Sequence, residues 1–184
     1  EEASEHEGGN SGKGGDKLYR WGNPINYDRG NLEDQKLKAQ HGVHWISSHM
    51  PGAGNLLIFN NNPTDTTGPN NNFGNSSVVE IIPPLNSNGL YDIVEDSAFG
   101  PNSYHWSYGG DNTFYSHFQS GAYRLQNGNT FITVSQERRF FEVDSGGEIV
   151  WEYNFENIQG HLGYSARAMK YDLNYLDITI GDLS

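Results

Sequence analysis

A tandem repeat is the feature of this sequence that most constrains its fold. Residues 104–108 and 149–153 each alternate large side chains with smaller ones around a tryptophan, as strands do. The two tryptophans, Trp106 and Trp151, lie 45 residues apart, a spacing within the range of a four-stranded β-propeller blade. Residues 18–21 have the same pattern earlier in the chain. The spacing therefore predicts consecutive units of similar structure.

Other strand-like segments keep one order before each tryptophan. They are residues 40–46, 54–59 and 78–81 in one copy, and residues 119–125, 128–133 and 140–143 in the other. Four segments in one order predict that each copy is a blade. A third copy begins at residues 165–171, where Ser165 follows Ser120 by 45 residues. We expect it to supply one strand to an unfinished or ring-closing blade.

We therefore predict an all-β fold in which residues 17–176 form about two full propeller blades with flanking strands. Residues 32–38 are expected to include a turn of helix. The polar, glycine-rich residues 1–16 are typical of a flexible linker, and residues 177–184 of a tail that starts a further module. Because propellers have 4–8 blades, the remaining blades are expected from the same precursor or another chain. A β-sandwich is the alternative fold.

Composition excludes several classes of function. The formal net charge of −12 argues against nucleic-acid partners, which require clustered Lys and Arg. The chain has no cysteine, so it has neither disulfides nor thiolate metal sites. No apolar run approaches the roughly 20 residues that span a membrane. We expect a secreted protein, periplasmic or extracellular, with no metal and no cofactor.

Several motifs resemble those of bacterial arylsulfotransferases. Gln40 and His41 are followed by a strand that ends Ile58-Phe59-Asn60-Asn61, and in that family a Gln-His pair begins a blade whose second strand ends in a Phe-Asp-Asn-Gly turn. This chain has Asn60 in place of the acid. The likeness covers about residues 16–176 and corresponds to the C-terminal part of secreted arylsulfotransferase-like propellers. Its other motifs are residues 18–24, 51–55, 139–143 and 147–153.

The resemblance implies a six-bladed propeller whose central funnel transfers a sulfuryl group from an aryl sulfate to a phenol. His41 matches the histidine that carries the group in that family. Ser120 and Ser165 then stand at equivalent first-strand positions, and Arg167 lies near the same rim, where it is expected to meet an anionic oxygen. The family's further histidines come from blades that are not in this chain, so catalysis is expected only in the assembled propeller.

Other residues are better explained by packing. His44 follows His41 by three residues in an expected strand, so we expect it to face the opposite side and to pack between blades. Trp21, Trp106 and Trp151 are expected to fill the space between blades. The asparagine-rich residues 60–72 are expected to be a solvated loop rather than a calcium site.

A second function stays open from the sequence. An incomplete set of blades leaves strand edges that readily pair with another chain. The alternative is therefore a non-catalytic extracellular propeller module, used for binding or assembly and completed by another chain.

Overall fold

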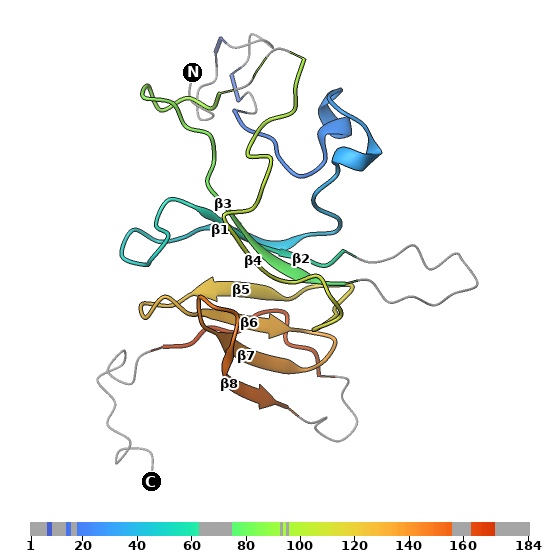
Figure 1. The fold of residues 1–184 in the computed structure, drawn as a ribbon, viewed down its shortest axis with the longest axis vertical. Coiled ribbons are helices and arrows are strands. Elements are labelled where there is room, and N and C mark those ends of the chain that lie inside the picture. Colours follow the sequence, from blue (N-terminus) through green and yellow to red (C-terminus); the bar gives the residue numbers. More distant parts are fainter. Residues whose placement is uncertain are drawn as a thin grey trace, which may run out of the picture.

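Two four-stranded antiparallel sheets form the body of the protein (Figure 1). The computed structural model describes residues 7–8, 14–15, 18–62, 75–92, 94, 96–155 and 163–171. Sheet 1 consists of β1 (His41–Trp45), β2 (Leu56–Asn60), β3 (Ser77–Ile81) and β4 (Trp106–Gly109). Sheet 2 consists of β5 (Gly121–Arg124), β6 (Thr130–Val134), β7 (Arg139–Val143) and β8 (Ile149–Asn154).

The all-β class and the order of four strands in each copy are confirmed. In both sheets each strand pairs with the next one along the chain. The two copies also share their register, because Glu80 of β3 faces Trp106 and Glu142 of β7 faces Trp151. The two sheets do not close into a ring, so their identity as propeller blades stays a prediction.

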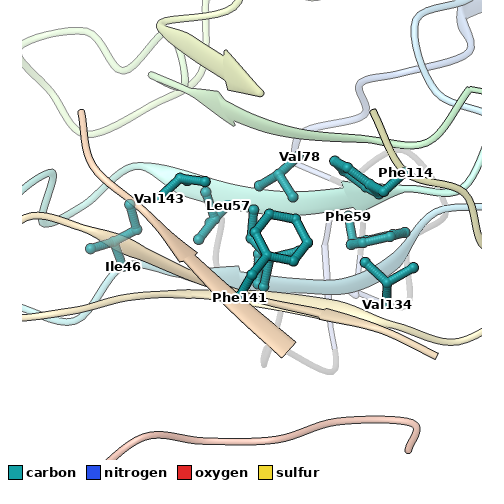
Figure 2. Packing of buried hydrophobic residues seen from close by; sticks show 10 residues of the cluster. Ile46, Leu57, Phe59, Val78, Phe114, Val134, Phe141 and Val143 are labelled. Atoms are coloured by element: carbon teal, nitrogen blue, oxygen red, sulfur yellow. The ribbon is translucent and has the colours of Figure 1, made fainter. Parts of the chain in front are cut away.

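The main core lies between the sheets. Side chains alternate across a strand, so each sheet turns one set of apolar residues toward the other (Figure 2). The inner strands β2 and β6 are almost wholly buried, with both faces covered. The buried members of this cluster are Ile46, Leu57, Phe59, Val78, Phe114, Ala122, Ile132, Val134, Phe141 and Val143.

The opposite face of sheet 1 is covered by the chain that precedes β1. Tyr19 and Trp21 pack there on a second cluster formed by Leu37, Ile58, Val79 and Ile81. The Tyr19 hydroxyl donates to the Gly100 carbonyl at 2.7 Å, and Trp21 Nε1 donates to the Pro101 carbonyl at 2.9 Å. The β3–β4 connection therefore lies beside the N-terminal segment on this side (Figure 1).

The segments before β1 differ in part from the prediction. Residues 18–21 join no sheet and are not a strand, because their tyrosine and tryptophan bond to the β3–β4 connection rather than to a strand edge. The expected helical turn is confirmed as a 3-10 helix at Leu32–Asp34, which Asn31 caps. Asn23 caps a further 3-10 helix, Pro24–Tyr27, that the sequence analysis missed.

Some predictions fall on other parts of the chain. Residues 165–171 are described and form no strand. The expected tail, residues 177–184, and most of the expected linker, residues 1–16, lie outside the described residues. Within the described residues, no helix has the length and apolar character of a membrane span.

Candidate functional site

A bulge in β1 places two histidines on one face of sheet 1. His41 pairs with Phe59 and His44 with Leu57, so the two residues between the histidines oppose the single residue Ile58 of β2. Gly42 absorbs the extra residue with φ +63, a left-handed conformation that glycine adopts without strain. Since Phe59 and Leu57 share a face, His41 and His44 also do. The prediction that His44 faces away from His41 is wrong for this reason.

Asn61 determines the tautomer of the neutral His41 ring. The side-chain amide of Asn61 donates through Nδ2 to the carbonyls of Ser116 at 2.7 Å and Gln119 at 3.1 Å. Its Oδ1 therefore faces His41 Nδ1 at 2.7 Å, and the Ala39 carbonyl lies 3.1 Å from the same nitrogen. Both neighbours are acceptors, so Nδ1 carries the proton and the lone pair of the neutral ring is on Nε2.

The turn after β2 explains why this arrangement forms. Asn60 is buried and accepts from the Lys38 backbone amide at 2.9 Å, while its Nδ2 lies 3.3 Å from the Lys36 carbonyl. An aspartate could make only the first of these bonds. Asn60 thus fixes the position of the chain that leads into His41, and the neighbouring Asn61 orients the imidazole ring of His41. Nε2 of His41 has no hydrogen-bond partner among the described residues, and the side chain is exposed.

Ser120 aligns with His41 in the sequence repeat, but it precedes β5, and the residue at the register position of His41 is Gly121. Its Oγ accepts from the Ser135 backbone amide at 3.0 Å and lies 3.4 Å from the Phe118 carbonyl. Ser135 follows β6 as Asn61 follows β2, so the pair of residues recurs. Ser120 is only 4% exposed, and its hydroxyl holds the start of β5 in place.

A buried polar seam, formed by Asn61, Ser76 and Ser116, lies between sheet 1 and the β4–β5 connection. Ser76 donates through Oγ to the Asn61 carbonyl at 2.9 Å and accepts from the Ser116 amide at 3.0 Å. All three residues are 0% exposed. Because their polar groups are paired, the seam fixes sheet 1 to the β4–β5 connection at little desolvation cost.

The first strands of the two sheets lie side by side. A Cβ added to Gly42 would be 3.3 Å from Cα of Gly121, and the rings of His44 and Tyr123 are 5.0 Å apart. A pocket of about 450 Å³ lies among the first strands of both sheets and the segment that begins the third copy. Its lining includes His44, His49, Met50, Tyr123, Met169 and Tyr171.

Ser165 and Arg167 lie on the described segment that follows sheet 2. Ser165 Oγ donates to the Arg167 carbonyl at 3.1 Å, and the Arg167 side chain is exposed. Neighbouring Tyr164 packs edge-on against Phe118 and lies under the Arg138 guanidinium. Among the described residues, no contact joins Ser165 or Arg167 to His41, so their proposed role as substrate contacts stays a prediction.

Glu80 is the centre of a charged cluster between the sheets. It is 2% exposed and receives Arg124 Nη2 at 2.5 Å and Asn55 Nδ2 at 2.6 Å. The Arg124 guanidinium also lies 5.2 Å from the centre of the Trp106 ring. A buried carboxylate requires such partners. Because Arg124 belongs to β5, the cluster ties sheet 2 to sheet 1.

Glu142 is the centre of a second cluster of the same composition. It is 4% exposed, bonds to Lys170 Nζ, and receives Asn129 Nδ2 at 2.6 Å and Asn127 Nδ2 at 3.2 Å. The Lys170 ammonium lies 5.1 Å from the centre of the Trp151 ring. Burial raises the pKa of Glu142, but the hydrogen bonds outweigh that effect and leave the pKa below its usual value.

The sequence analysis missed these clusters and the role of Asn61. The repeat alignment does contain the signal, because Glu80 and Glu142 occur at the same place in their copies. A carboxylate on the inner face of a strand needs a cation. Arg124 lies in β5 and Lys170 in the segment that begins the third copy, so each is a basic residue near the start of the following copy.

Comparison with known proteins finds no matching protein-family model, no similar curated protein and no similar solved structure. The resemblance to arylsulfotransferases therefore stays a prediction from the motifs. No group of three or more potential metal ligands occurs among the described residues.

Proposed function

We propose that this chain forms blades of a β-propeller that transfers a sulfuryl group from an aryl sulfate to a phenol through His41. The observation that carries the proposal is the Asn61 contact, which leaves the lone pair of the exposed ring on Nε2. A neutral imidazole in that form is a competent nucleophile. The first strands of sheets 1 and 2 lie side by side, which is compatible with the funnel of a propeller.

The reaction has two displacements at sulfur. His41 Nε2 attacks the sulfur of the aryl sulfate, the S–O bond to the aryl group breaks, and the phenolate leaves and takes a proton from solvent. The oxygen of the acceptor phenol then attacks the same sulfur, the N–S bond breaks, and the acceptor's proton goes to solvent. Asn61 stabilises the positive ring of the intermediate by accepting from Nδ1–H.

The developing sulfate charge requires donors beyond His41. In this proposal the exposed guanidinium of Arg167 meets an anionic oxygen in the assembled propeller, and Ser165 lies beside it. Ser120, which is buried at the start of β5, is the third proposed contact to the substrate. Histidines from the remaining blades complete the site.

The test is sulfuryl transfer from 4-nitrophenyl sulfate to phenol by the intact assembly. His41→Ala should abolish transfer while the assembly remains folded, and mass spectrometry of the wild type should find one SO₃ group on His41. His105→Ala is the matched control, since His105 is exposed, precedes β4 and does not line the pocket that includes His44. Transfer that survives in His41→Ala would refute the role of His41.

A non-catalytic binding or assembly module is the second candidate. The observation that favours it is the exposure of β8, in which every residue is exposed, and exposed edges and faces of sheets are common sites of association. A folded, intact assembly that transfers no sulfuryl group from any aryl sulfate would support this function over the first.

A further inference from the structure

The two carboxylate clusters show how one copy is joined to the next. In sheet 1 the carboxylate of β3 binds a cation from the first strand of the following copy, and that cation lies over the tryptophan of β4. In sheet 2 the carboxylate of β7 and the tryptophan of β8 have the same relationship to Lys170. Lys170 therefore has the place that Arg124 has one copy earlier.

The apolar surroundings repeat as well. The face of sheet 1 that carries Glu80 also carries Leu57, Val78, Trp106 and Tyr108, and sheet 2 covers it. The matching face of sheet 2 carries Glu142 with the counterparts Phe131, Phe140, Trp151 and Tyr153.

In sheet 2 this face is uncovered over β8. Trp151 is 41% and Tyr153 is 53% exposed, whereas their counterparts in β4, Trp106 and Tyr108, are partly buried. The rings are already ordered against one another, with Trp151 stacked near Tyr153, and Tyr153 near Phe140. Lys170 is the cation that a covering sheet would bring with its first strand.

We propose that the aromatic face of sheet 2, where Phe140, Trp151 and Tyr153 lie beside the already buried Phe131, is a docking surface for a third four-stranded sheet of this same repeat. Residues 167–170 are the first strand of that sheet. The second strand pairs with these residues, and each later strand pairs with the one before it. The inner face of the third sheet presents mainly aliphatic side chains and one phenylalanine, as sheet 2 presents to sheet 1 through Ala122, Ile132, Val134, Phe141 and Val143.

This inference does not depend on sulfuryl transfer, since it rests on the packing and the ion pairs that join one copy to the next. It also defines a register. Lys170 follows Arg124 by 46 residues, so the first strand of the third sheet is displaced by one residue from the 45-residue spacing of the tryptophans. A displacement of one residue turns every side chain of a strand to the other face, which makes the register testable.

The test extends the chain with a third copy taken from its own sequence. A copy of residues 125–155 is joined directly after Lys170, so that Lys170 precedes it as Arg124 precedes Leu125. Hydroxyl-radical footprinting with mass spectrometry then measures the oxidation of each aromatic side chain. Trp151 and Tyr153 should become as protected as Trp106 and Tyr108 in the same molecule.

Two matched extensions serve as controls. In one, the copy is joined after Tyr171, which keeps Lys170 but shifts the register by one residue. In the other, the copy is joined after Lys170 and carries Ile132→Asp in the copied segment only. Both should leave Trp151 as accessible as in the unextended chain, while unchanged labelling of Trp106 shows that sheets 1 and 2 remain folded.

Other outcomes would overturn the proposal. If Trp151 stays accessible in the Lys170-joined chain while Trp106 is unchanged, the face does not accept a sheet of this kind. Equal protection in all three extensions would show covering without the register that Lys170 defines, and would refute the specific docking proposed.

Discussion

Asn61 holds the ring of His41 by accepting its Nδ1 proton, at an N–O distance of 2.7 Å. The proton position follows from two carbonyls on the other side of the amide, which leave Asn61 only one orientation. The reactivity proposed for His41 is thus set by groups on the β4–β5 connection, at some distance along the chain.

Replacing Asn61 with leucine should change both the ring and the fold. The carbonyls of Ser116 and Gln119 would lose a buried donor, and the free energy of unfolding should fall by about 1–3 kcal/mol. Imidazole nitrogen shifts measured by NMR should report the Nδ1–H tautomer in the wild type and a mixed population in Asn61→Leu. A wild-type His41 found mainly as the Nε2–H tautomer would contradict this description of the site.

The buried pair of Glu80 and Arg124 should be far more sensitive than an exposed one. Arg124→Met leaves the Glu80 carboxylate buried without its cation, so urea unfolding should show a loss of about 3–5 kcal/mol. The double variant with Glu80→Gln should lose less than the sum of the single changes. The control Arg29→Met breaks the exposed pair with Asp96 and should cost about 1 kcal/mol or less.

Stability should depend on pH through Glu142. Its pKa is lower in the folded chain than the ordinary value of 4.5, so its contribution is fully present above that value and is lost as the pH falls toward the folded pKa. Unfolding of the wild type and of Glu142→Gln, measured from pH 7 to pH 3, should therefore converge at the acid end. Glu137, whose pKa burial raises, is common to both proteins and cancels in the difference.

Two glycines separate backbone strain from steric overlap. Gly109 and Gly54 have similar φ angles of +83 and +85, but a Cβ at Gly109 would lie 2.6 Å from Phe114 Cε1, and at Gly54 nothing lies within 4 Å. Both alanine variants incur the left-handed backbone cost. Gly109→Ala should cost about 1–3 kcal/mol more, because the Phe114 ring must move. Equal thermal shifts in the two variants would contradict the packing described around Gly109.

The repeat made the sheets predictable from sequence. Strand order and the alternation of large side chains are local properties, and they predicted the eight strands of sheets 1 and 2. Residues 18–21 have the same local pattern and yet form no strand, because Tyr19 and Trp21 bond to the Gly100 and Pro101 carbonyls instead. A local sequence pattern indicates which structure a segment favours, but the residues that the segment contacts determine the structure that it adopts.

The site was less predictable because it depends on irregular backbone. Alternation assigns His44 to the face opposite His41, and only the bulge at Gly42 returns it to the same face. The orientation of Asn61 depends on carbonyls from residues 116 and 119, and no periodicity in the sequence encodes such a contact. Ser165 and Arg167 stay predicted substrate contacts, because no contact joins them to His41 among the described residues.

The contact between sheets 1 and 2 joins two different surfaces, a face rich in aromatic residues on sheet 1 and a mainly aliphatic face on sheet 2. A junction of this kind has a polarity, so successive sheets add in one direction. Each added sheet exposes a new aromatic face on which the next sheet can pack. Such growth ends in only two ways. Either the rotation between neighbours brings the last sheet back to the first and closes a circle, or a terminal unit lacks the acceptor face and halts a filament.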